Sequence, residues 1–287
     1  MVKRLAKIRE ASRQRFGVQP LADSVAPLET WWDGPVGQAV LAEEQPLIDR
    51  SLRHIYGFHL MQLAVSRRID LTAASTINHR FALSPALAHA DDEVGQLFAG
   101  RADLERIPLA SETIDLAILH HVLEFSQNPH QMLRETARVL IPRGYVAVLC
   151  FNPFSWFGVF KQFGRFSRRA QWRHHALRLG RVIDWLRLLD FEPVSVSHGF
   201  YRWPISHPAI MQSTRWMEAA GRSTRLPVGG FYFILARKDV VCVTPVKPSW
   251  KKFNPIEGLV GVQPSSRVVE PLRSPNAARS NNNQDLS

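Results

Sequence analysis

Residues 102–153 read ADLERIPLASETIDLAILHHVLEFSQNPHQMLRETARVLIPRGYVAVLCFNP, and this stretch decides the fold. It contains two short, nearly continuous apolar segments, Ile114 to Leu119 and Tyr145 to Phe151. Such segments are typical of parallel strands that are covered on both faces. Between them, residues 131–140 carry apolar side chains at helical spacing. The stretch therefore predicts a strand, a helix and a second strand in succession.

The ends of this helix are marked by residues with known positional preferences. Asn128 is a favourable N-cap, Pro129 suits the first helical position, and Gln131 has the spacing of a capping box. Pro142 and Gly144 then stop the helix and turn the chain into the next strand.

Further apolar segments extend the pattern in both directions. Leu60 to Val65, Pro193 to Ser197 and Phe231 to Ala236 predict strands, and residues 182–189 predict an amphipathic helix. Strands that alternate with helices indicate an α/β doubly wound sheet.

Residues 102–153 also resemble the second half of the class I S-adenosylmethionine-dependent methyltransferases, in the type 11 branch. The resemblance implies a Rossmann-like, doubly wound, mostly parallel seven-stranded sheet with an antiparallel last strand. It also implies a cytoplasmic enzyme that transfers a methyl group from S-adenosyl-L-methionine to an acceptor. The matching features are the acid Asp103, the step Ile107–Pro108, the strand start at 114–117, the segment at 123–125, the helix at 134–140, and Pro142 with Gly144.

The flanking segments ETWWDGPVGQAVLAEEQPLIDRSL, YGFHLMQLAV and FNPFSWFG resemble a bacterial group of methyltransferase-domain proteins. This chain departs from the family at two places. Ala64 stands where a glycine usually ends the first strand, and residues 82–84 lack the acid that usually holds the ribose hydroxyls. A charge-assisted hydrogen bond contributes about 1.5–3 kcal/mol, so these departures predict weakened cofactor binding.

The resemblance implies a set of cofactor-binding positions at the strand ends. The methionine end of the cofactor would lie against the first strand, the adenine amino group on an acid after the third strand, and the sulfonium near the end of the fourth. These positions are Gln62, Ala64 and Ser66, then Asp103 with Leu104, and finally His120.

Structural roles for the same residues remain open. Asp103 is also suited to cap a turn, and His120 or His121 to be a core histidine with a satisfied hydrogen bond. Glu124 is expected to orient the loop before Pro129 rather than to act as a base. Alignment of donor and acceptor is the main requirement for methyl transfer, so no catalytic residue is assigned.

Metal and nucleophile chemistry are not predicted. Four of the eleven histidines form two adjacent pairs, His120 with His121 and His174 with His175, and neighbours in a regular element point apart. Cys150 and Cys242 lie in apolar runs and are expected to be reduced core residues.

A basic aromatic insert, residues 152–180, follows the strand that ends at Phe151. Residues 161–181 hold seven basic residues and no acid. Three interpretations remain open: a lid packed on the body, contact with an anionic membrane surface, or a nucleic-acid grip. Asn152, Trp156 and Trp203 are expected on the substrate face.

The formal charge of +11 includes six basic and three acidic residues in 1–29 and the same numbers in 245–287. We expect a basic arm at 1–29, a methyltransferase-like domain at 30–244 and a disordered Pro-rich tail at 245–287. No apolar run is long enough to cross a bilayer. The alternative function is a non-catalytic protein of the same fold that binds RNA, an anionic membrane or a protein partner through its insert.

Overall fold

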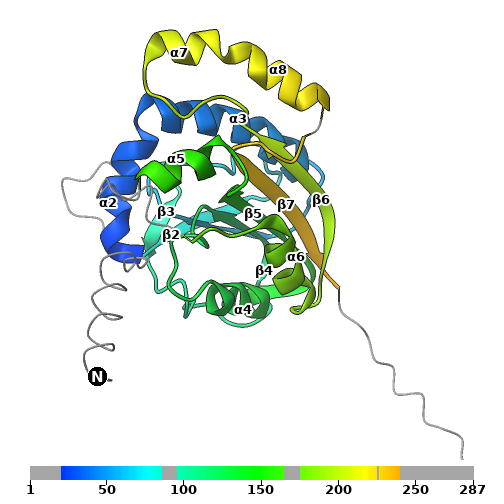
Figure 1. The fold of residues 1–287 in the computed structure, drawn as a ribbon. Coiled ribbons are helices and arrows are strands. Elements are labelled where there is room, and N and C mark those ends of the chain that lie inside the picture. Colours follow the sequence, from blue (N-terminus) through cyan, green and yellow to red (C-terminus); the bar gives the residue numbers. More distant parts are fainter. Residues whose placement is uncertain (1–20, 86–95, 165–174, 225, 240–287) are drawn as a thin grey trace, which may run out of the picture. The chain divides into compact units, whose positions relative to one another are not determined.

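Seven strands form one sheet in the order β3-β2-β1-β4-β5-β7-β6 (Figure 1). The computed structural model describes residues 21–85, 96–164, 175–224 and 226–239. Strands β1 to β5 pair in parallel, and β7 runs antiparallel to β5 and β6. The predicted fold class, a Rossmann-like and mostly parallel sheet with an antiparallel last strand, is confirmed. The strands are β1 (His59–Ala64), β2 (His79–Ser84), β3 (Phe98–Arg101), β4 (Ile114–His120), β5 (Leu140–Phe151), β6 (Phe191–Gly199) and β7 (Phe231–Lys238).

Helices cover both faces of the sheet, as the apolar strands require (Figure 1). In β4, Leu116 and Ile118 point to one face of the sheet. They pack there in the core that includes Ile48 of helix α3 (Pro35–Leu52). Ala117 and Leu119 point to the core on the other face, because side chains alternate along a strand. The covering helices are α3 (Pro35–Leu52) on the first face, and α4 (Pro129–Val139) and α6 (Leu179–Arg187) on the second.

Helix α4 begins as predicted but is capped differently. Pro129 is its first residue and Asn128 occupies the N-cap position, yet the Asn128 side chain makes no capping bond. Its amide instead donates to Glu105 Oε2 at 2.8 Å, and Gln131 Nε2 reaches the Glu105 carbonyl at 3.5 Å. The predicted capping box is therefore wrong, because the side chains of Asn128 and Gln131 both donate hydrogen bonds to Glu105 of the preceding loop.

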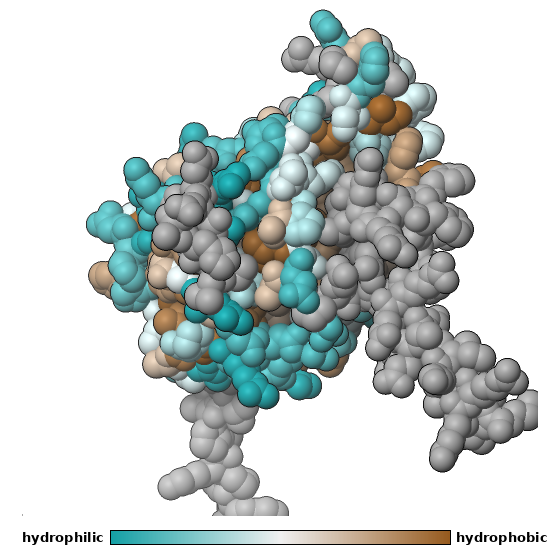
Figure 2. All heavy atoms as spheres, turned by 90° about the vertical axis from the view of Figure 1, so that its left-hand side faces the viewer, coloured by the Kyte–Doolittle hydropathy of each residue, from teal (hydrophilic) through white to brown (hydrophobic). Residues whose placement is uncertain are grey.

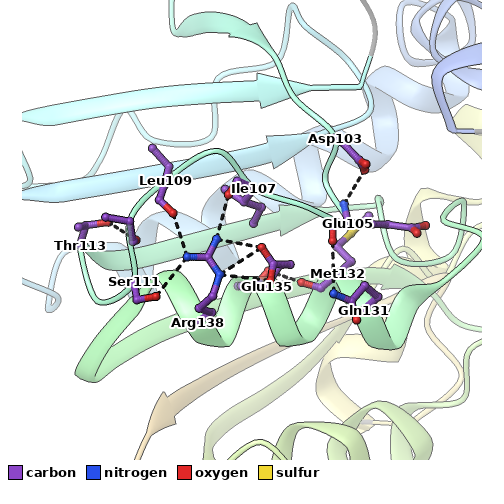
Figure 3. A network of polar contacts seen from close by, with 12 residues as sticks. Asp103, Glu105, Ile107, Leu109, Ser111, Thr113, Gln131, Met132, Glu135 and Arg138 are labelled. Atoms are coloured by element: carbon purple, nitrogen blue, oxygen red, sulfur yellow. Dashed lines mark hydrogen bonds and ion pairs between the residues drawn. The ribbon is translucent and has the colours of Figure 1, made fainter.

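Arg138 in the last turn of α4 ties that helix to the loop between β3 and β4 (Figure 3). Its guanidinium donates to the carbonyls of Leu109 and Ile107, both at 2.9 Å, and forms an ion pair with Glu135 at 2.9 Å. The planar guanidinium supplies several donors in a fixed geometry, so one side chain binds two carbonyls of the loop. The loop that begins near Asp103 is thereby held against α4.

Helix α2 (Leu21–Trp32) corrects the predicted domain boundary. Val25, Leu28 and Trp32 are each 1% exposed and belong to the hydrophobic core. Residues 21–29 are thus part of the folded domain, and the arm predicted at 1–29 is wrong for this portion. The predicted tail at 245–287 lies outside the described residues.

The remaining helices are α5 (Trp156–Gly164), α7 (Pro208–Ser213) and α8 (Arg215–Thr224). Trp216 of α8 and Leu226 are exposed apolar residues, and Figure 2 shows brown side chains in the upper part of the molecule. Cys150 is a buried free thiol, as predicted, and Cys242 lies outside the described residues. None of the helices in the described ranges is both long and apolar enough to cross a membrane.

Candidate functional site

The carboxyl ends of the parallel strands meet at one edge of the sheet. Ala64, the last residue of β1, lies in register with His120, the last residue of β4. This edge is where open α/β sheets bind ligands. The structure brings the six predicted cofactor-binding positions to it in two groups: Gln62, Ala64, Ser66 and His120 at the ends of β1 and β4, and Asp103 with Leu104 after β3.

Two adjacent histidines at the end of β4 converge on one carboxylate. His121 Nε2 lies 2.7 Å from Glu44 Oε1, and His120 Nε2 lies 3.0 Å from Glu44 Oε2. On its other side, His121 Nδ1 lies 2.6 Å from Glu124 Oε1, which also accepts the backbone N–H of Phe151 at 3.0 Å. The two histidines and the two glutamates are completely buried. We call these four residues the His–Glu cluster.

The convergence corrects the expectation that neighbouring histidines point apart. That expectation assumes a regular strand, but β4 ends at His120, and His121 has a φ of 51°. This left-handed conformation turns the second side chain toward the same carboxylate as the first. Glu124 was expected to orient the loop before Pro129 rather than to act as a base, and in the structure its carboxylate contacts His121.

The His–Glu cluster has the geometry of a potential metal site but is internally hydrogen-bonded. The ligand atoms of Glu44, His120 and His121 lie within 4.8 Å of one another. Both carboxylate oxygens and both Nε2 atoms already bond each other. The expectation that the chain binds no metal stays a prediction.

Burial and charge set the protonation of the His–Glu cluster. Burial lowers the pKa of His121, but the carboxylates of Glu44 and Glu124 outweigh it and raise the pKa to about 9. Burial raises the pKa of Glu44, but His121 and both histidine hydrogen bonds bring it below its usual range. For His120, burial lowers the pKa more than Glu44 raises it. At neutral pH, Glu44 is therefore an anion, His121 a cation and His120 neutral.

The neutral state of His120 also fixes its tautomer. Its Nε2 donates to Glu44, so Nδ1 is left as an acceptor. Nδ1 is buried and has no hydrogen-bond partner among the described residues. His120 was predicted to face the sulfonium of the cofactor, yet its ring is packed inside the protein.

Helix α2 closes the space above the ends of β1 and β4. The Trp32 ring lies 4.8 Å from the His120 ring and 5.1 Å from the His121 ring, centroid to centroid. Beside it, Glu29 accepts three hydrogen bonds from Arg67: from the backbone N–H at 2.8 Å, from Nε at 2.9 Å and from Nη2 at 2.8 Å. We call this Glu29–Arg67 pair the α2 clamp. It is buried, and it fixes α2 directly on the loop that follows β1.

The polar groups predicted to contact the cofactor near β1 are engaged elsewhere. Gln62 is fully buried, and its amide donates to the Ile69 carbonyl at 2.6 Å while its Oε1 accepts from the Leu71 N–H at 3.0 Å. Ser66 Oγ accepts from the Arg68 N–H at 3.2 Å. In this structure Gln62 shapes the loop after β1 and does not face a ligand.

A cavity remains open at the ends of β2 and β3. Its volume is about 320 Å³, and Asp103 and Leu104 line it together with Pro85, Arg101 and Met132. Asp103 Oδ1 accepts the Glu105 N–H at 2.9 Å, so it also caps a turn. The cofactor and the turn-cap interpretations of Asp103 are therefore compatible, since a carboxylate has several acceptor positions.

The predicted substrate-face residues lie together beyond β5. The rings of Trp156 and Trp203 are in edge contact with centroids 5.8 Å apart, and both are more than a third exposed. Asn152 is buried and bonds the Pro227 carbonyl and the Phe154 N–H. Most basic residues of 161–181 fall outside the residues whose side chains are described; Arg178 and Arg181 are described.

Glu44, whose carboxylate contacts both histidines of the site, was not predicted from the sequence. Its signal was present: Val40, Glu44 and Ile48 recur every four residues along α3, which places the acid within a buried apolar stripe. A carboxylate in such a position needs a buried partner. Glu29 and Trp32 were not identified either.

Comparison with known proteins gives one family match and several similar proteins. A family model described as "Methyltransferase domain", of type 11, matches residues 72–148. The match runs from before β2 into β5, so this part of the chain is similar to that family, and the sheet has the strand order of a methyltransferase fold.

The chain is similar to the uncharacterized protein YafS of Escherichia coli. The two are 29% identical over 234 residues, and the alignment covers 79% of this chain and 88% of YafS. Among solved structures, a methyltransferase of Thermotoga maritima described as a possible histamine N-methyltransferase is 15% identical, with a TM-score of 0.49, over 82% of this chain and 97% of its own. A methyltransferase of Mesorhizobium loti is 16% identical, with a TM-score of 0.45, over 67% of this chain and 96% of its own.

The residues present fit only one end of the cofactor that the family implies. Ala64, Ser66 and His120 are at most 2% exposed, so the end of β1 leaves no room for a methionine group. Asp103, in contrast, is exposed and lines the open cavity. With α2 in this position, the structure leaves room beside Asp103, where the resemblance puts adenine, and none at the end of β1, where it puts the methionine group.

Proposed function

We propose that the chain is a methyltransferase that binds S-adenosylmethionine and transfers its methyl group to an acceptor, and that α2 must withdraw for the donor to bind completely. The observation that carries this proposal is the cavity beside Asp103 and Leu104, at the place where the family resemblance puts adenine. When bound, the donor supplies a methyl group that is already activated by positive charge, so the protein mainly aligns the reactants and excludes water.

The chain's own residues have definite roles in this proposal. Asp103 accepts a hydrogen bond from the adenine amino group while it keeps its turn bond to the Glu105 N–H. The α2 clamp opposes entry, because separating Glu29 from Arg67 breaks three hydrogen bonds in a buried site. The apparent affinity for the donor is then the intrinsic affinity multiplied by the fraction of molecules in which α2 is open.

The test is titration calorimetry with S-adenosylmethionine and with its demethylated product. Asp103→Ala should weaken binding by about tenfold or more, since a hydrogen bond to a charged group contributes roughly 1.5–3 kcal/mol. Glu192→Ala, which removes another exposed acid, on β6, is the matched control and should change nothing.

Glu29→Gln weakens the α2 clamp while keeping its shape. It should bind the donor more tightly than the unmodified chain. Equal and measurable affinity in both proteins would show that the clamp does not control entry.

A second candidate is a non-catalytic protein of the same fold, and a specific observation favours it: the donor crevice is filled by Trp32 and the α2 clamp. Absence of binding at millimolar donor in both the unmodified chain and Glu29→Gln would support this candidate and reject the enzyme.

A further inference from the structure

An apolar cavity of about 670 Å³ lies between α5 and α8, on the side of the site where the substrate-face residues meet. Six of its lining side chains are large, apolar and between 43% and 69% exposed. They lie on or beside α5 and α8, or in the segment that follows α8. Contiguous exposed apolar surface of this kind usually marks a binding site. The six are Phe154, Trp156, Val159, Trp216, Leu226 and Val228.

A second cavity, of about 910 Å³, adjoins the first through the shared residues Phe154 and Val228. Arg178 and Arg181 line it, and Asp184 is an acid in the same wall. The Arg178 guanidinium lies 5.1 Å from the centre of the Phe154 ring, so the charge sits at the boundary of the two cavities.

The start of α6 adds to the positive character of this second cavity. Arg178 occupies the N-cap position, and no side chain caps the helix. The first backbone N–H groups of a helix lack intrahelical partners and favour anions. An anionic group in this cavity would therefore meet two guanidinium groups and a helix N-terminus.

We propose that the two joined cavities bind one anionic lipid of a bilayer surface, with its acyl chain in the apolar cavity and its headgroup at Arg178 and Arg181. The surrounding sequence supports the charge of this partner, because residues 161–181 carry seven basic residues and no acid. An almost entirely apolar wall suits a hydrocarbon chain and offers few partners to the polar edges of an RNA base. The site stands whether or not the chain transfers methyl groups.

Co-sedimentation of the full chain with vesicles tests the surface. Vesicles of phosphatidylcholine mixed with an equal part of phosphatidylglycerol should bind the chain, and pure phosphatidylcholine should bind it at least about tenfold more weakly. Arg178→Glu with Arg181→Glu should remove this preference. Arg187→Glu, an exposed charge at the other end of α6, is the matched control and should bind like the unmodified chain.

Tryptophan quenching by lipids with brominated acyl chains tests the apolar cavity. Trp156 and Trp216 line it, so their fluorescence should fall on binding, and replacing both by Phe should abolish most of the quenching. Ala220→Trp, which fills the cavity from α8, should reduce binding; Val228→Asp is the second variant if Ala220→Trp does not fold.

Three results would overturn the proposal. They are equal binding to both vesicle types, binding without quenching, and binding to single-stranded RNA with none to vesicles. Free inorganic phosphate and dihexanoyl phosphatidylglycerol are added as competitors of vesicle binding, to distinguish a site for the anionic group alone from a site for the whole lipid. If phosphate competes and the short-chain lipid does not, the proposed lipid site is rejected.

Discussion

Raising the pH from 6.5 to 8.5 should destabilise this protein through a single histidine. The native His–Glu cluster holds the His121 proton with a pKa of about 9, against an ordinary value of 6.5. A group whose pKa is raised by folding contributes stability that is complete below its unfolded pKa and is lost as the pH rises through its folded pKa. The full difference corresponds to about 3 kcal/mol, of which about 2 kcal/mol is lost between pH 6.5 and 8.5.

The titratable groups around His121 decide over which pH range its loss of stability can be measured separately. Glu44 has a lowered pKa and stays ionised throughout, and His120 has a lowered pKa and stays neutral. Cys150, near Glu124, has a pKa raised by burial, and its thiol would ionise near pH 9 once unfolded. Measurements should therefore stop at about pH 8.5, so that the thiol contributes little.

Urea denaturation followed by tryptophan fluorescence, at half-unit steps of pH, measures the effect. His121→Gln should be less stable at pH 6.5 and should lack the alkaline loss. His54→Gln removes an exposed histidine and should keep the loss unchanged.

If His121→Gln does not fold, Glu124→Gln serves as the second variant. It removes one of the two carboxylates that raise the pKa of His121, so the loss should shrink. A free energy of unfolding that falls by the same amount in the unmodified chain and in these variants would show that His121 is not the source of the loss.

Three further substitutions test the architecture by urea or thermal denaturation. Trp32→Ala should cost roughly 3–5 kcal/mol, because it empties the contact with the His–Glu cluster; a cost below about 1 kcal/mol would contradict the packing. Arg138→Lys should lower the free energy of unfolding by about 1–3 kcal/mol, since an ammonium group cannot make all the hydrogen bonds of the planar guanidinium in Figure 3. An unchanged melting temperature would show that these hydrogen bonds do not stabilise the fold. Asp115→Ala should cost about 1–3 kcal/mol, because its carboxylate accepts the N–H groups of Phe58 and His59 at 2.9 Å, and Asp115→Asn should recover part of the loss.

The elements of the sheet could be predicted from local patterns. Strand β4 was predicted at Ile114 to Leu119 and found at Ile114–His120, and β7 was predicted at Phe231 to Ala236 and found at Phe231–Lys238. Continuous apolar runs arise from burial on both faces, so they identify strands without knowledge of the partners. The caps of α4 were predicted less well, since Glu105 lies outside the local motif.

Parts of the candidate site were also within reach of the sequence. Asp103 and Leu104 follow β3 and do line an open cavity, and Trp156 and Trp203 do meet. Gln62 and His120 were correctly placed at the edge, but their availability to a ligand was not predictable. Whether a polar side chain faces a ligand or another residue depends on what packs above it.

Local sequence patterns predicted the strand and helix order, the sheet class and the edge that holds the candidate site, because these follow from periodicity and from the direction of parallel strands. The packing of the whole chain places α2 over the ends of β1 and β4 and brings Glu44 to His121 across 77 positions of the chain. Helix and strand patterns depend on residues close together in the sequence, and they are the same whether or not these distant contacts form. The contacts therefore arise only when the whole core packs.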